Sequence, residues 1–169
     1  MTHGLPDAEA ALAELVERML GSVPHDAALV GIYSGGAWLA ERLAEALPGD
    51  HPLGFIDVSF YRDDYATAGL KGGTKRSDIP FDVAGARIVL IDDVLYTGRS
   101  VRAAVNELFD FGRPAAIELA VLIDRGGREL PIEPTYVGAR IAVARDLTVV
   151  LSRGADGHLA LGVEPVAGA

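Results

Sequence analysis

The sequence predicts an α/β fold, in which a mainly parallel, twisted sheet is flanked by helices. Residues 88–91 and 117–123 are apolar on every face, which is typical of strands buried on both sides of a parallel sheet. Such runs alternate along the chain with stretches whose apolar residues recur at helical spacing. We expect one domain over residues 1–169, because this length is sufficient for a single hydrophobic core.

The first part of the chain predicts a helix at 7–20, a strand at 28–33, a second helix and a strand at 53–61. The first helix carries an apolar stripe of Leu12, Leu15, Val16, Met19 and Leu20. Strand 28–33 leads through Ser34, Gly35 and Gly36 into the second helix, whose apolar residues are Trp38, Leu39, Leu43 and Leu47. Taken alone, the two glycines indicate no more than a tight turn.

Residues 62–80 show no apolar periodicity and combine glycines with the positive charges of Lys71, Lys75 and Arg76. A structureless run of this length within a compact domain is often a mobile, functional loop. A solvated insertion fits the same pattern equally well, so the residues alone leave both interpretations open.

The second half of the chain predicts a central strand, a helix, another strand and a terminal hairpin. The helix has the apolar stripe Val101, Val105, Leu108 and Phe109 and is capped by Gly112. Residues 129–144 are expected to be irregular. The expected ranges are 87–93 for the central strand, 99–111 for the helix, 117–123 for the next strand, and 147–151 with 158–161 for the hairpin.

Composition and charge limit the class of protein. The chain has no cysteine, which excludes a disulfide scaffold and thiolate chemistry. Neither a signal peptide nor a membrane-spanning run is evident, so a cytoplasmic protein without a membrane partner is expected. The net charge of −9, with no dense window of Lys and Arg, argues against binding nucleic acid through phosphate contacts.

The end of the central strand combines two acids with a turn suited to an anion. Asp92 and Asp93 end the strand, where ligands bind in open α/β sheets. The helix that follows presents unpaired N–H groups and the positive end of its dipole to the turn. Thr97 and Ser100 supply hydroxyl groups, and Gly98 allows close backbone approach. This combination predicts a phosphate site.

The two carboxylates must serve another part of the ligand, because they would repel a phosphate. They can accept hydrogen bonds from a ribose diol, or balance a Mg²⁺ that itself holds phosphate oxygens. Phosphoribosyl pyrophosphate has a phosphate, a diol and a bound metal, and so matches every group. The sequence lacks the P-loop and the dinucleotide fingerprint. A helix-capping role for Asp92 and Asp93 is the structural alternative, but two acids, two hydroxyls and a glycine exceed what a cap requires.

This stretch, residues 91–100, resembles the phosphoribosyl pyrophosphate motif of type I phosphoribosyltransferases. Segments 57–64, 77–82 and 119–132 resemble the PyrR family, whose members are bifunctional pyrimidine operon regulators and uracil phosphoribosyltransferases. The similar segments cover most of residues 28–140. The resemblance implies the type I phosphoribosyltransferase fold with a small hood and a C-terminal hairpin, assembled as a homodimer or higher homo-oligomer.

The resemblance also implies roles for individual residues. Asp92 and Asp93 would hold the ribose hydroxyls and be catalytic, together with Arg62 of a flexible loop at 62–80 that closes over the reaction centre. The residues implied to bind phosphoribosyl pyrophosphate are Asp92, Asp93, Val94, Leu95, Tyr96, Thr97, Gly98, Arg99 and Ser100. The implied pyrophosphate loop is Ser34, Gly35 and Gly36, and the implied base-binding residues are Asp124, Arg125 and Val137, with a hood at 137–141. Mg²⁺ would be bound through phosphoribosyl pyrophosphate, with no direct protein ligand.

The implied reaction converts uracil and phosphoribosyl pyrophosphate to UMP and pyrophosphate. Purine-salvage members of the superfamily tend to carry an acid directly before the Thr-Gly pair, whereas this chain has Tyr96, which favours a pyrimidine. The family's transition state resembles an oxocarbenium ion, so the protein positions its substrates and stabilises the leaving group, and supplies no nucleophile.

The alternative is an RNA-binding regulator of pyrimidine operon transcription that senses UMP or UTP and has weak or no turnover. Its partner would be the pyrimidine mRNA leader, bound in the family by a basic surface. Here the first helix offers only Arg18, and Gly127 stands where related sequences often have His, although Arg125, Arg128 and Arg140 are present. A sensor that acts through protein partners would have the same sequence features as the enzyme.

Overall fold

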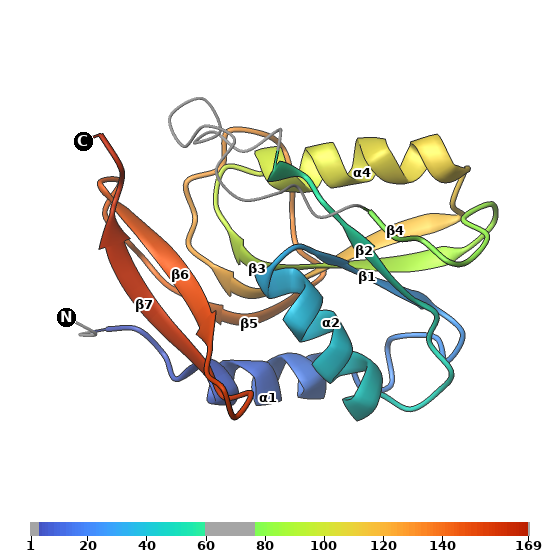
Figure 1. The fold of residues 1–169 in the computed structure, drawn as a ribbon, viewed down its shortest axis with the longest axis horizontal. Helices are drawn as coiled ribbons and strands as arrows, with labels where there is room; N and C mark the ends of the chain where they lie inside the picture. The colour runs from blue at the N-terminus through green and yellow to red at the C-terminus, as the bar shows by residue number, and fades with distance from the viewer. Residues whose placement is uncertain (1–3, 60–76, 169) are drawn as a thin grey trace.

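The computed structural model describes residues 4–59 and 77–168. The described helices and strands, labelled as in Figure 1, are α1 (Ala8–Met19), β1 (Ala28–Ile32), α2 (Gly35–Ala46), β2 (Leu53–Ile56), β3 (Arg87–Leu95), α4 (Arg99–Phe111), β4 (Ala116–Asp124), β5 (Tyr136–Arg140), β6 (Leu147–Arg153) and β7 (Leu159–Pro165).

Strands β1 to β5 form one parallel sheet in the order β2-β1-β3-β4-β5. The central strand β3 pairs with β1 and β4, and all five residues of β1 are buried. The carboxyl ends of the strands therefore lie along one edge, beside which the β6–β7 hairpin stands (Figure 1). The predicted α/β fold with a mainly parallel sheet is confirmed.

Helices cover both faces of the sheet. Val89 and Ile91 of β3 belong to the core cluster that contains α1 and α2 side chains, whereas Ile88 and Leu90 belong to the cluster that contains α4 side chains. Successive residues of a strand point to opposite faces, so an uninterrupted apolar run is what a sheet between two helical layers requires. Figure 1 shows α1 and α2 on one side of the sheet and α4 on the other.

The predicted helices form close to their expected bounds. Asp7 caps α1, accepting a hydrogen bond from the Ala10 N–H at 2.9 Å. Helix α4 spans the predicted residues 99–111, and Gly112 is its C-cap. The prediction of the apolar stripe of α4 is wrong at one position, because Phe109 is 52% exposed whereas Leu108 is buried. Of the described helices, none is long and apolar enough to cross a membrane.

Two predicted segments differ from the structure. Strand β2 ends at Ile56, short of the predicted end at residue 61. The segment 129–144, expected to be irregular, contains β5, which pairs with β4 over Val121 and Val137. Gly138 permits this strand to lie close to α1, since a Cβ there would come within 2.7 Å of the Ala11 carbonyl oxygen. The implied hood at 137–141 thus begins within the main sheet.

The predicted C-terminal hairpin is confirmed and is longer than expected. Strands β6 and β7 pair antiparallel from Leu147 opposite Pro165 to Arg153 opposite Leu159. Two of its buried side chains, Leu151 and Leu159, join the core cluster that contains α1 and α2 side chains. The hairpin is therefore packed onto the sheet's helical layer, and this packing fixes it beside the carboxyl edge of the sheet.

Candidate active site

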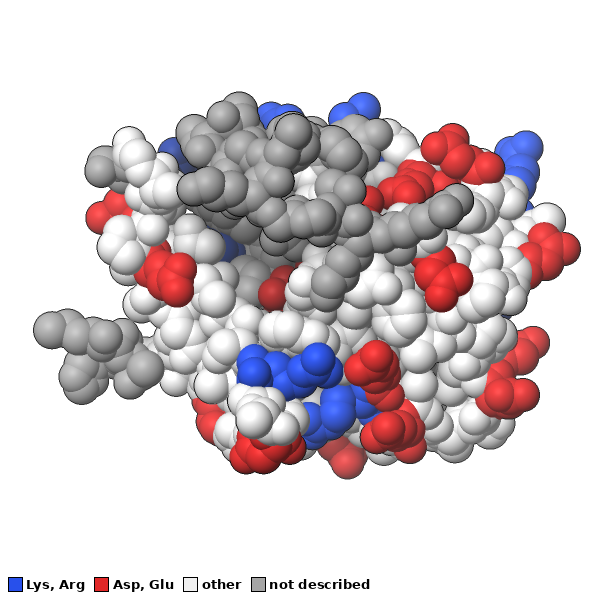
Figure 2. All heavy atoms as spheres, in the orientation of Figure 1, with Lys and Arg blue, Asp and Glu red and all other residues white. Residues whose placement is uncertain are grey.

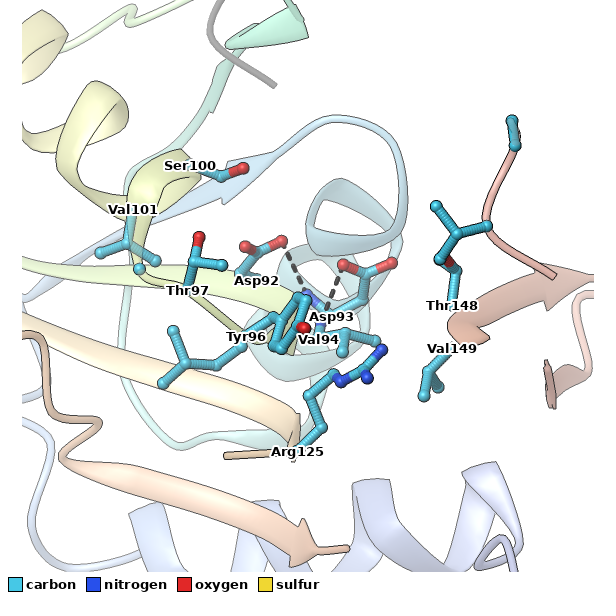
Figure 3. A pocket seen from close by; sticks show the side chains of 14 residues that line it. Asp92, Asp93, Val94, Tyr96, Thr97, Ser100, Val101, Arg125, Thr148 and Val149 are labelled. Carbon is cyan, nitrogen blue, oxygen red and sulfur yellow. Dashed lines mark hydrogen bonds between the residues drawn. The ribbon is translucent and has the colours of Figure 1, made fainter. Parts of the chain in front are cut away.

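A cavity of about 470 Å³ lies where β3 ends, a volume typical of small-molecule sites (Figure 3). The turn after β3 forms one side, the start of β6 faces it, and the segment after β7 completes the wall. The lining residues are Asp92, Asp93, Val94, Leu95, Tyr96, Thr97, Gly98, Ser100, Val101, Arg125, Thr148, Val149, Val166 and Ala167.

Both predicted acids lie in the cavity wall, within the last residues of β3. Asp92 is 5% exposed, and one of its oxygens accepts the Asp93 N–H at 2.9 Å. Asp93 in turn accepts the Val94 N–H at 2.8 Å. These two hydrogen bonds, dashed in Figure 3, fix the carboxylates against the backbone. A carboxylate has two oxygens and can accept several hydrogen bonds, including those of ligand hydroxyls.

The predicted pyrophosphate loop lies beside Asp93. Ser34 is the N-cap residue of α2, and Gly35 and Gly36 form its first turn. A Cβ on Gly35 would come within 2.9 Å of the Asp93 Cβ and closer still to its carboxylate, so a side chain here requires Asp93 to move. The loop does not line the cavity itself, but through Gly35 it contacts an acid that does. Backbone N–H groups at this helix start are available to an anion.

The turn between β3 and α4 has the features of a phosphate loop. Thr97, Gly98 and Ser100 line the cavity, and Gly98 has φ +93°. A Cβ on Gly98 would also come within 2.9 Å of Ile132, so this position requires glycine for two reasons. Arg99 does not line the cavity, and its side chain extends to Glu129 at 3.5 Å.

Tyr96 is held in the cavity wall by its neighbours. The Arg125 guanidinium lies over the Tyr96 ring, 3.9 Å from its centroid, as Figure 3 shows. Gly127 has φ +78°, and a Cβ there would come within 2.9 Å of the tyrosine Cδ2. A side chain at position 127 would therefore displace the tyrosine ring.

Arg125, predicted to border the base, lines the cavity and is 6% exposed. Its Nη1 donates to the Leu147 carbonyl at 2.7 Å, and its Nη2 donates to the carbonyls of Ala144 at 3.0 Å and Val143 at 3.4 Å. These bonds attach the start of β6 to the turn after β4. Arg125 therefore joins the two walls of the cavity.

Asp124, also predicted to border the base, does not line the cavity. Its Oδ2 is bound by Arg128 at 2.8 Å and by Arg140 at 2.6 Å, and its Oδ1 accepts the Gly126 N–H at 3.0 Å. Burial by itself would raise the pKa of this carboxyl. The hydrogen bonds from Arg128 and Gly126 and the charges of both arginines outweigh burial, and the pKa lies below its usual range.

The remaining predicted residues lie away from the cavity or outside the described residues. Val137 is a core residue of β5, 7% exposed, and is absent from the cavity wall. Arg62 lies outside the described residues, as does most of the expected loop at 62–80. No group of metal-ligating side chains suited to a metal occurs in the described ranges.

Sequence reasoning missed the wall contributed by the C-terminal hairpin. Thr148 and Val149 of β6 face the acids of β3 across the cavity, and Val166 and Ala167 after β7 also line it. The hairpin itself was predictable from its two short segments and the turn at Asp156 and Gly157 between them. No local signal indicates where a hairpin docks.

A parallel sheet with acids and a helix N-terminus at the end of its central strand defines the class of protein. The chain matches the family model "Phosphoribosyl transferase domain" over residues 4–145, and it belongs to this family. A hypoxanthine-guanine phosphoribosyltransferase from Bacillus anthracis has the same fold, with a TM-score of 0.64 at 19% identity over 82% of this chain and 83% of that one. A hypoxanthine phosphoribosyltransferase from Staphylococcus aureus superposes with a TM-score of 0.62 at 22% identity, covering 89% and 82%.

Within this class the chain belongs to the PyrR family. It is 52% identical to the "Bifunctional protein PyrR" of Ralstonia nicotianae over 93% of this chain and 92% of that protein. It is 51% identical to the protein of the same name from Pseudomonas fluorescens, over 78% and 79%. The predictions of a phosphoribosyltransferase and of the PyrR family are confirmed.

Proposed function

We propose that this chain transfers the phosphoribosyl group of phosphoribosyl pyrophosphate to uracil, releasing UMP and pyrophosphate. The observation that carries the proposal is the placement of Asp92, Asp93 and the 97–100 turn in one cavity. The acids suit the ribose diol, and the turn suits the 5′-phosphate. Both groups lie at the end of the same strand and line the same cavity, as the binding of a single ribose phosphate requires.

Each part of the substrate has a corresponding group in this arrangement. The 5′-phosphate binds at the start of α4, and the ribose hydroxyls donate to Asp92 and Asp93. The pyrophosphate binds at the first turn of α2, beside Gly35. The bond from C1′ to pyrophosphate breaks, the bond from C1′ to N1 of uracil forms, and the N1 proton is released. The protein accelerates this exchange by holding the two reactants in line.

Mg²⁺ would reach the site bound to phosphoribosyl pyrophosphate, where it neutralises charge on the departing pyrophosphate. Two carboxylates in the cavity wall fit this arrangement, because Mg²⁺ is commonly held by one or two carboxylates together with substrate phosphates. Asp92 and Asp93 are the residues that would face such an ion, through the bound phosphoribosyl pyrophosphate.

A pyrimidine substrate is supported by Tyr96 and by membership of the PyrR family. Tyr96 places an aromatic ring, not an acid, in the wall directly before Thr97. With Arg125 packed over that ring, the wall next to the incoming base is fixed, and the hairpin side chain Thr148 faces it. The tyrosine ring in place of an acid before the Thr-Gly pair supports a pyrimidine over a purine as the base.

The name of the relatives, "Bifunctional protein PyrR", indicates a second activity in those proteins. In this chain the guanidinium of Arg125 is buried and that of Arg128 is bonded to the Ile132 and Tyr96 carbonyls and to Asp124. On the face in Figure 2, basic and acidic side chains are interspersed. An RNA-binding surface would therefore need other cations, and we place the transferase reaction first.

The proposal is tested by pyrophosphate release with uracil as substrate, and with orotate and hypoxanthine as competing bases. Asp93→Asn is expected to lower kcat/KM for phosphoribosyl pyrophosphate by about a hundredfold or more, because a charged acceptor of ribose hydroxyls is lost. Asp110→Asn is the matched control, since Asp110 is an exposed acid of α4 outside the cavity. Equal activity of the Asp93 and Asp110 variants, or a preference for hypoxanthine, would refute the proposal.

A further inference from the structure

The outer side of the phosphate loop is held by the segment that follows β4. The Tyr96 carbonyl accepts a hydrogen bond from Arg128 Nη1 at 3.0 Å. The Thr97 carbonyl accepts the N–H groups of Glu129 at 2.9 Å and Leu130 at 3.1 Å. Two consecutive carbonyls of the loop are thus bonded to residues 128–130, on the side away from the cavity.

The direction of these carbonyls determines what the loop presents to a ligand. In a planar trans peptide the C=O and N–H bonds point in opposite directions. Fixing the Tyr96 and Thr97 carbonyls outward therefore directs the N–H groups of Thr97 and Gly98 towards the cavity. Within the described part of the chain, neither N–H group has a hydrogen-bond partner. A reversed peptide would instead present a carbonyl oxygen to the phosphate and repel it.

We propose that Arg128 is a positioning residue that orients the amides of the phosphate loop for the 5′-phosphate. Its guanidinium forms three bonds at once: Nη1 to the Tyr96 carbonyl, Nε to the Ile132 carbonyl at 2.8 Å, and Nη2 to Asp124 at 2.8 Å. Asp124 is itself fixed by Arg140 of β5 and by the Gly126 N–H. The orientation of the loop is therefore set by a chain of bonds that runs from β5 through Asp124 and Arg128.

Arg128 suits this role because its planar guanidinium sets the directions of its hydrogen bonds as well as supplying a positive charge. A lysine at this position can offer its ammonium to Asp124, but it cannot hold three acceptors in the same plane. Arg128 does not line the cavity, so it acts on the ligand only through the loop. The inference rests on the proposed function, in that the ligand of the loop is taken to be the phosphate of a ribose 5-phosphate.

Titration calorimetry with UMP, ribose 5-phosphate and pyrophosphate tests the inference. Arg128→Ala is expected to weaken binding of UMP and ribose 5-phosphate by about tenfold to a hundredfold, the loss expected for charge-assisted hydrogen bonds. Pyrophosphate, bound at the first turn of α2, should keep its affinity. Arg128→Lys should lie between the unaltered protein and Arg128→Ala. A merely structural defect would weaken all three ligands alike.

Arg42→Ala is the matched control, because Arg42 also forms a forked pair with a carboxylate, Glu9, but lies outside the site. It is expected to lower the free energy of unfolding and to leave all three affinities unchanged. Unchanged UMP affinity in Arg128→Ala, or equal losses for UMP and pyrophosphate, would overturn the inference. If Arg128→Ala does not fold, Arg128→Lys carries the same comparison. Failure of the unaltered protein to bind UMP would overturn the proposed function together with the inference.

Discussion

Two carboxylates, in different parts of this molecule, each bind arginine side chains, and the two hydrogen-bond networks hold different parts of the structure. Glu9 of α1 accepts from Arg42 of α2 at 2.7 and 3.3 Å and from the Leu159 N–H of β7 at 2.9 Å. Asp124, at the end of β4, accepts from Arg128, Arg140 and the Gly126 N–H. Both carboxylates accept hydrogen bonds from arginine side chains and from a backbone N–H, and the pKa of each lies below its usual range.

The two networks differ in burial and in what they hold. The Glu9 side chain is 25% exposed and joins two helices to the hairpin, and none of its partners lines the cavity. The Asp124 side chain is 5% exposed, and its partner Arg128 bonds directly to the phosphate loop. The same chemistry therefore secures the packing of the hairpin in one place and, by our proposal, the direction of the loop amides in the other.

The largest effect is expected from removing the buried acid. Asp124→Ala should lower the free energy of unfolding by about 3 kcal/mol, because Arg128 and Arg140 are left without their carboxylate. This loss of unfolding free energy is at the lower end of the range of about 3–5 kcal/mol for breaking a buried ion pair, because Arg128 keeps two carbonyl acceptors. UMP affinity should fall as well. Urea unfolding and calorimetry measure the two effects, and a loss of stability with unchanged affinity would contradict the role assigned to this network.

A smaller effect is expected at the more exposed acid. Glu9→Gln should lower the free energy of unfolding by about 1 kcal/mol, because the charge facing Arg42 is lost while the amide oxygen can still accept the Leu159 N–H. Affinity for UMP should not change. A clear loss of UMP affinity in this variant would show that the hairpin anchor also acts on the site, and would remove the distinction between the two networks.

The sequence predicted those parts of the site that are contiguous in the chain. Asp92, Asp93, Thr97, Gly98 and Ser100 follow one another around a strand end, so residue type and order alone place them together. The parallel sheet was predictable for a similar reason, because each buried strand is apolar on both faces over several residues.

The parts that escaped prediction depend on long-range packing. Asp124 was interpreted as a base contact, but Arg140 reaches it because β5 pairs with β4. That pairing was missed, because strand β5 has only five residues and follows a segment that contains prolines. Likewise, Thr148 enters the cavity wall because Leu151 and Leu159 dock the hairpin on the core. Neither contact leaves a signal in the neighbouring sequence.

The smallest effect concerns pH, and it tests whether Glu9 stabilises the protein through its charge. A carboxyl whose pKa is lowered on folding stabilises the protein above its unfolded pKa of about 4, and the contribution is lost as pH falls through the lower folded value. The difference in unfolding free energy between the unaltered protein and Glu9→Gln should therefore be present at neutral pH and shrink below about pH 4. Urea unfolding at a series of pH values measures it. A difference that stays constant into the acid range would mean that Glu9 acts through packing and not through its charge.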